Sequence, residues 1–193
     1  MDFRVESLWM SVGAPNKTFE AEKNRATFSR GAVLYVLAGL LFGIVTTFGL
    51  MATEGLAGLD GTENAIWIIT WPMGYLISAL IGSAIVHGLC KLLNGEGAFV
   101  QLFYLNSLYA PLFALVSALA TLHPFLVLGV SGTLFFWSIF LQYRAVRVAH
   151  HLSRLRSAIV VVVPGFLMVV LAVVLVMVFA IFTNLGSLAQ LPL

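Results

Sequence analysis

The chain has 193 residues, of which 61% are hydrophobic and only 9% are charged, and its formal net charge is +2. Its mean hydropathy is +1.03, and several apolar runs reach about 20 residues, the length that a helix needs to cross a ~30 Å hydrocarbon layer. This composition excludes a soluble globular protein. The runs are continuous rather than alternating, which excludes a transmembrane barrel. The sequence therefore predicts an all-α, polytopic transmembrane helical bundle.

Five spans follow in chain order. A segment over residues 1–30 precedes them, the membrane domain covers residues 31–183, and an external tail covers residues 184–193. No secretory signal is expected, because the first apolar run begins too far from the start. Pro124 separates the third span from the fourth, since proline fits the first turn of a helix and disfavours helix before it. The predicted spans are Gly31–Thr53, Ala65–Leu89, Ala98–Leu122, His123–Tyr143 and Ser157–Phe182.

The positive charges give the orientation. All ten Lys and Arg residues fall on one side of the five-span scheme, and positive residues stay on the cytoplasmic side. The sequence thus predicts a cytoplasmic N-terminus and an external C-terminus. The stretch Phe3–Val12, with Trp9, is a candidate interfacial helix. The cations are Arg4, Lys17, Lys23, Arg25 and Arg30 before the first span, Lys91 after the second, and Arg144, Arg147, Arg154 and Arg156 after the fourth.

Small residues at helical spacing predict where helices pack, because close backbone approach has to replace the hydrophobic effect in lipid. One seam is Gly39 and Gly43 in the first span, and the other is Gly74, Ser78 and Gly82 in the second. Spacing does not decide whether these seams join helices of one chain or of two. Candidate kinks lie at Pro72, at Pro111, and at Pro164 with Gly165. The valine-rich last span is expected to face lipid.

The order of several short motifs resembles the Yip-domain family, small five-span membrane proteins related to the Ypt/Rab-interacting proteins of the secretory pathway. The motifs are "HGLCKLLNGEGAFVQLFYLNSLYAPL", then "HPF", then "RAVRVAHHLSRLRSAIVVVVPG". The short segment before the first span resembles prokaryotic members, which implies the prokaryotic cytoplasmic membrane. The resemblance implies a non-enzymatic protein that organises the membrane or partner proteins. The matching features are His87, Lys91, Gly95, Gly97, Phe99, Tyr109, Ala110, Pro111, Ser157 and Ala158, with Pro15 and Phe19 near the start.

The stretch between the second and third spans is the main candidate site. Gly95 and Gly97 permit a sharp turn, and Glu96 can pair with Lys91 or with an arginine of the next loop. We interpret it as a structural clasp first and as a docking surface second. Its residues are His87, Lys91, Gly95, Glu96, Gly97, Phe99, Asn106, Tyr109 and Pro111. Five cations are candidate contacts for anionic lipid headgroups, namely Lys91, Arg144, Arg147, Arg154 and Arg156.

The sequence offers no catalytic set. The apolar spans contain no Asp, Glu, Lys or Arg, which argues against a pump, and no metalloprotease, phosphate-loop or nucleophile motif is present. A metal site from His87, Cys90 and His150 is weaker than the interpretation that these side chains face water at the interface. We expect no enzyme, cofactor, metal or nucleic-acid partner. The expected partners are anionic lipid and other membrane proteins or a second copy. Transport of a lipid or small solute, or an accessory role in a larger complex, are the alternatives.

Overall fold

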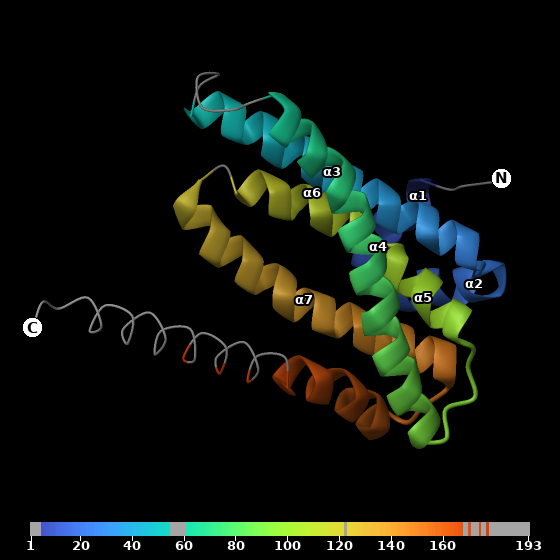
Figure 1. Ribbon diagram of the computed structural model, residues 1–193. Helices are drawn as coiled ribbons and strands as arrows, with labels where there is room; N and C mark the ends of the chain where they lie inside the picture. Colours follow the sequence, from blue (N-terminus) through green and yellow to red (C-terminus); the bar gives the residue numbers. More distant parts are fainter. Residues whose placement is uncertain are drawn as a thin grey trace, which may run out of the picture.

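The computed structural model describes residues 5–54, 61–121 and 123–167, together with Val170, Val174 and Met177. In this part of the chain the fold is all-α and contains no strand. A helix over residues 154–167 follows the last labelled one (Figure 1). The labelled elements are α1 (Val5–Gly13), α2 (Pro15–Glu22), η1 (Lys23–Arg25), α3 (Phe28–Glu54), α4 (Gly61–Leu92), α5 (Phe99–Ser107), α6 (Ala110–Ala120) and α7 (Pro124–His150).

Among the described residues, three helices are long and apolar enough to cross a membrane, and the number rises to four if α5 and α6 together form one span. The three segments are Phe28–Gly49, Ile68–Leu92 and Phe125–His150. The predicted fifth span, Ser157–Phe182, is described without a gap only as far as residue 167, and beyond that only at Val170, Val174 and Met177. The helix over residues 154–167 contains its beginning, and most of its side chains are exposed, as expected for a helix that faces lipid.

The predicted third span is not one continuous helix. Helix α5 ends at Ser107, α6 begins at Ala110, and the two are bent by 41°. Pro111 explains the break, because its ring clashes with the carbonyl four residues earlier and it has no N–H to donate. The kink expected at Pro111 is therefore present, and it takes the form of a break between two helices. Pro72, by contrast, lies inside an uninterrupted α4.

Helix α7 begins where proline predicts. His123 is its N-cap with an extended backbone, and Pro124 occupies the first turn. The helix continues well past Tyr143, the predicted end, to His150, after which His151 adopts a left-handed conformation with φ of 53°. The segment over residues 144–150 was expected to be a loop and is helical. Arg144 and Arg147 therefore belong to the last turns of α7.

The bundle is packed around α3, which contacts α4, α5 and α6, while α5 and α6 also contact α7. Phe103 of α5 is completely buried, and its ring stacks on Phe28 and Phe99 and lies 5.1 Å from the ring of Tyr35. Phe19 of α2 is completely buried as well. The best-packed core thus lies toward the end of the bundle where α2 and α5 meet.

In contrast to this buried core, α4 and α7 expose large apolar side chains on their outer surfaces. On α4 every fourth side chain from residue 69 to residue 85 is exposed, and all are large and apolar: Ile69, Met73, Ile77, Ile81 and Ile85. On α7, Phe125, Leu128 and Phe136 are exposed. A helix in lipid has no reason to bury such residues. These surfaces are the lipid-facing side of an integral membrane protein.

Candidate functional site

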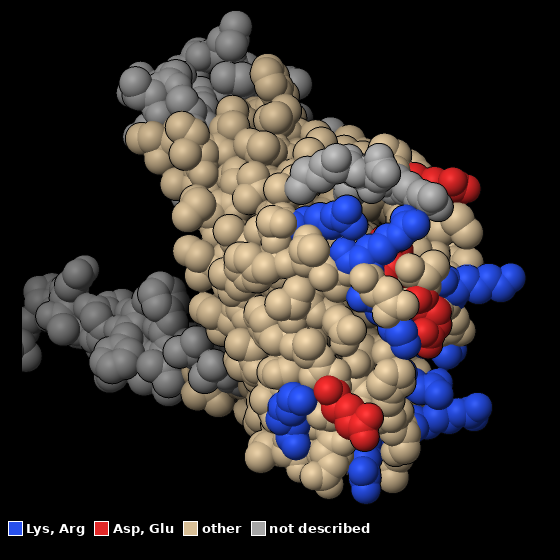
Figure 2. Space-filling view, turned by 90° about the vertical axis from the view of Figure 1, so that its right-hand side faces the viewer, with Lys and Arg blue, Asp and Glu red and all other residues tan. Residues whose placement is uncertain are grey.

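The charged and polar groups gather at one end of the molecule, which we call the polar end. It consists of α1, α2, η1, the first turn of α3, the last turns of α4 with the turn over residues 93–98, and the segment over residues 143–156. Figure 2 looks at this end and shows the Lys and Arg side chains spread over it, with acidic side chains between them. The described cations there are Lys17, Lys23, Arg25, Arg30, Lys91, Arg144, Arg147, Arg154 and Arg156.

The turn over residues 93–98 lies directly against the end of α7. A Cβ added to Gly97 would overlap the carbonyl group of Ala149 and approach His150 Cα to 3.0 Å. A Cβ added to Gly95 would lie 3.1 Å from His150 Cβ. Neither glycine has the positive φ that the expected sharp turn suggested. They are needed because two backbones touch, which is a different reason from the one predicted.

Backbone hydrogen bonds complete this contact. Asn94 supplies the left-handed residue after α4, with φ of 63°. The Gly95 amide then donates to the Cys90 carbonyl at 2.8 Å, and the Glu96 amide donates to the His150 carbonyl at 3.3 Å. The first bond is made to a carbonyl in the last turn of α4 that also accepts from the Leu93 amide, and the second satisfies the carbonyl of the last residue of α7. The turn therefore joins the ends of two helices.

Two histidines meet beneath the turn. His87 Nδ1 and His150 Nε2 are 3.3 Å apart, and the His87 ring meets the Phe99 ring edge to face. His150 and Cys90 are buried, so the expectation that they face water was wrong for both. The described residues contain no group of three or more His, Cys, Asp or Glu arranged to hold a metal ion. The pair instead links α4 to α7.

Glu96 does not form the ion pair that its position suggested. No Lys or Arg of the described chain lies within ion-pair distance of its carboxylate, and Lys91 is exposed. The turn over residues 93–98 is instead linked to the helix over residues 154–167 by Arg156, whose Nη1 donates to the Leu93 carbonyl at 3.3 Å. A guanidinium bound to a backbone carbonyl takes the place of the expected salt bridge.

Arg144 and Arg147 lie along the last two turns of α7 and are half-buried. The Arg144 guanidinium carbon lies 5.0 Å from the centre of the Phe140 ring, and that of Arg147 lies 5.8 Å from the centre of the Tyr143 ring. Cation–π contacts of this kind favour arginine over lysine. Two of the five predicted lipid contacts thus pack against aromatic rings of the protein. The other three, Lys91, Arg154 and Arg156, have exposed side chains.

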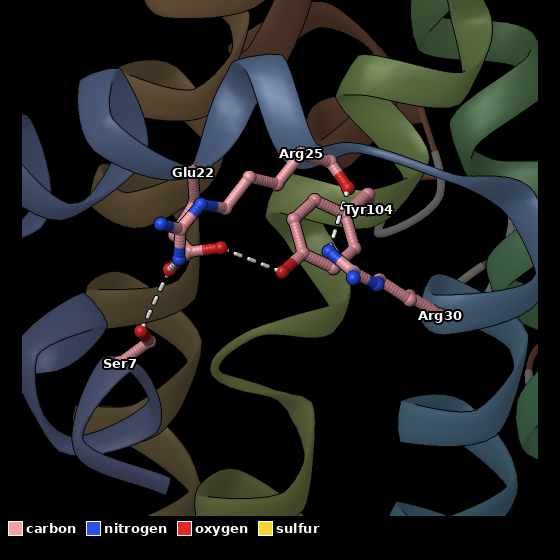
Figure 3. A network of polar contacts seen from close by, with 5 residues as sticks. All are labelled: Ser7, Glu22, Arg25, Arg30 and Tyr104. Carbon is pink, nitrogen blue, oxygen red and sulfur yellow. Dashed lines mark hydrogen bonds and ion pairs between the residues drawn. The ribbon is translucent and has the colours of Figure 1, made fainter. Parts of the chain in front are cut away.

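A buried carboxylate anchors the N-terminal helices to the bundle (Figure 3). Glu22, at the end of α2, accepts a 2.9 Å hydrogen bond from the Tyr104 hydroxyl of α5 and a 2.8 Å bond from the Ser7 hydroxyl of α1. Arg25 lies 3.9 Å from the same carboxylate, and Arg30 donates to the Arg25 carbonyl. Glu22 is only 7% exposed. Three segments of the chain therefore converge on one acidic side chain.

Sequence reasoning missed this anchor. Glutamate is almost never buried unless it is paired, and the partner hydroxyl of Tyr104 lies 82 residues away in the chain. One available signal was Phe19 with Glu22 in α2. The two lie three residues apart, on one face of the helix, and both are buried.

Asn106 and Tyr109 flank the α5–α6 break and were expected to hydrogen-bond across helices. The Tyr109 hydroxyl instead donates to Asn106 Oδ1 at 3.3 Å, across the break itself. Pro111 follows in the first turn of α6. Asn106 and Tyr109 also line an open cavity of about 330 Å³ between the helices. The break therefore places polar groups along this cavity.

The glycine seam of α3 is used within the chain. A Cβ on Gly39 would overlap Pro72 Cα of α4, and a Cβ on Gly43 would lie 3.2 Å from Trp71 Cδ1. The backbone of α4 at Pro72 thus approaches α3 so closely that only glycine fits at position 39. This seam joins two helices of one chain.

The seam of α4 has no such contact. A Cβ on Gly74 or on Gly82 would meet nothing within 4 Å, and Ser78 between them is exposed. Identical spacing therefore has two outcomes: one seam is filled by a neighbouring helix, and the other faces away from the described bundle or borders its cavity.

The sequence matches a known protein family. A model of the Yip1 domain matches residues 11–182. The chain belongs to the Yip1 domain family. Yip1-domain proteins are generally non-enzymatic membrane proteins that interact with other proteins. No curated protein and no solved structure matches the chain. The family resemblance in the motifs is thereby confirmed, and this Yip1-domain chain is an integral membrane protein.

Proposed function

We propose that this Yip1-domain protein is a non-enzymatic organiser that crosses a prokaryotic cytoplasmic membrane five times and holds partner proteins against its cytoplasmic side. The observation that carries the proposal is the polar end, where cations gather on a surface braced by Glu22 and by the turn over residues 93–98. By the positive-inside rule, this end and the segment over residues 1–30 are cytoplasmic, and the tail over residues 184–193 is external.

The braced surface suits docking because its groups are held in place before a partner arrives. Lys91, Arg154 and Arg156 are exposed there, and each cation close to an anionic leaflet contributes about 1 kcal/mol of attraction. The turn itself, with Gly95, Glu96 and Gly97, is the clasp that fixes these charges relative to one another. No contact in the described part of the chain favours transport or membership of a larger complex.

The orientation is tested by cysteine labelling in sealed inverted and right-side-out vesicles. Cys90 is completely buried, so a cysteine introduced at an exposed position reports alone. We expect Arg154→Cys to react with an impermeant maleimide only from the cytoplasmic side and His123→Cys only from the other side. Reaction of both from one side would refute the five-span scheme.

The docking role is tested by photo-crosslinking from residues 91 and 154 in native membranes, with Ile69 and Ile77 on the lipid-facing stripe as control positions. We expect discrete protein adducts from the polar end, weakened by the triple change Lys91→Gln, Arg154→Gln and Arg156→Gln, and lipid adducts from the controls. A chain that gives no protein adduct and runs as a 20.9 kDa monomer in native lipid would refute the proposal.

A further inference from the structure

The cavity beside the α5–α6 break is lined by hydroxyl and amide groups. It measures about 330 Å³, lies between α3, α4, α6 and α7, and none of the described residues that line it carries a charge. Its polar lining residues are Tyr35, Tyr75, Ser78, Ser83, Asn106, Tyr109, Ser117, Ser138 and Gln142.

Two amide side chains in this lining have groups without a hydrogen-bond partner among the described residues. Asn106 is only 5% exposed, and its Oδ1 accepts from Tyr109, whereas its Nδ2 has no acceptor there. The half-buried Gln142 side chain has no partner in the same ranges. Ser78 and Ser138 differ, because their hydroxyls donate to carbonyls of their own helices, at 3.0 and 2.7 Å. Amide groups that line a cavity and are not paired within the protein can donate hydrogen bonds to a bound molecule, so the cavity is suited to a ligand that accepts hydrogen bonds.

An apolar groove continues from the cavity. It measures about 420 Å³ and lies between α4, α7 and the helix over residues 154–167. Four residues line both spaces, namely Ser78, Gly82, Ser138 and Gln142, so the two are continuous. Each volume lies within the range of about 300–1,000 Å³ that small-molecule sites occupy. The groove is walled by Ile81, Ile85, Val86, Phe135, Ile139 and Val161.

We propose that the cavity and groove together bind a neutral lipid with a small hydroxyl-bearing head, of the diacylglycerol class. The uncharged head lies among the amides and hydroxyls, and an acyl chain follows the groove past Gly82 toward the bilayer. This site is separate from the docking surface of the polar end, and the inference goes beyond the proposed function.

The depth of the cavity decides the charge of the head. Ser138 lies near the middle of the Phe125–His150 span, and Ser78 lies inside the Ile68–Leu92 span. A phosphate at this depth would be buried without a cation, which is strongly unfavourable. A hydroxyl can leave the headgroup layer if it finds hydrogen bonds, and Asn106 and Gln142 supply them.

The test uses the whole protein in phosphatidylcholine nanodiscs and a diacylglycerol that carries a diazirine in one acyl chain. We expect photolabelling on groove residues of α4, α7 and the helix over residues 154–167. Unlabelled diacylglycerol should compete, and phosphatidic acid with the same chains should not. Gly82→Leu, which fills the junction of the two spaces, should reduce labelling about fivefold or more.

Gly74→Leu is the matched control. Both glycines lie on α4 and have open space at the Cβ position, but Gly74 borders neither space, so its substitution should leave labelling unchanged. Asn106→Leu, which removes the unpaired amide at similar volume, should also lower labelling, and the melting temperature of each variant reports whether it folds. Equal labelling of the wild type, Gly82→Leu and Asn106→Leu would overturn the proposal. So would equal competition by phosphatidic acid, or labelling confined to Ile69, Met73 and Ile77, the part of the exposed stripe that lies outside the groove.

Discussion

The polar end and the α4–α7 flank use the same residue type for opposite purposes. At the polar end Gly95 and Gly97 bring two backbones into contact, so a single methyl group has no space. On the flank Gly74 and Gly82 have open space at the Cβ position. A glycine in a membrane helix is therefore informative only when the atoms that face it are known.

Charge divides the two regions in the same way. The polar end buries the Glu22 carboxylate and the His150 ring, each with a hydrogen-bonding partner, whereas the described flank presents isoleucine and phenylalanine to lipid. One region depends on specific contacts and the other on general affinity for hydrocarbon. Substitutions should accordingly be costly at the polar end and tolerated on the flank.

Gly97→Ala should have the largest effect. The new methyl group overlaps the Ala149 carbonyl, both partners are backbone, and overpacking of this kind costs about 3 kcal/mol. We expect a clear fall in melting temperature in detergent micelles and loss of the contact between the turn and α7. Gly88→Ala, on the last turns of α4 with open space at its Cβ, is the control. Equal melting temperatures for the two variants would show that the turn does not touch α7.

Gly39→Ala should come next, at about 2 kcal/mol, because the methyl group would push α3 away from Pro72. The measurement is unfolding by denaturant in mixed micelles. Gly74→Ala makes the same substitution on the flank, where the added methyl group has open space. Its free energy of unfolding should stay within about 0.5 kcal/mol of the wild-type value. The comparison fails if both substitutions are neutral, since the α3 seam would then be as open as that of α4.

Glu22→Ala should have the smallest of the three effects, about 1.5 kcal/mol, because it leaves the Tyr104 hydroxyl buried without its acceptor. Limited proteolysis should then cut between α2 and α3 sooner than in the wild type. Glu20→Ala removes an exposed ion pair with Lys23 and should change little. Identical cleavage rates in both variants would mean that Glu22 does not hold the N-terminal helices.

Much of the fold could be predicted from local chemistry. Pro124 fixes the start of α7 whatever surrounds it, and the long apolar runs of α3 and α4 leave little choice in a bilayer. Pro111 predicted a kink, but only packing decides whether a helix bends or breaks there.

The contacts of the candidate site were harder to predict. The turn over residues 93–98 was placed between the right helices, but its docking on Ala149 and His150 depends on where α7 ends, and α7 is longer than its apolar pattern indicates. The seams at Gly39 and Gly74 have the same spacing, so no local rule separates them. Glu22 depends on a hydroxyl from a distant helix, which no periodicity reveals.

The bond between Glu22 and Tyr104 has a consequence for how the nascent chain matures. Its two residues are 82 positions apart, so at about 5–20 residues per second the ribosome makes the tyrosine on the order of ten seconds after the glutamate. Helices α3 and α4 emerge in between and enter the insertion machinery first. The N-terminal helices therefore cannot make this contact when they are first synthesised, and they close onto the bundle only after α5 has been made.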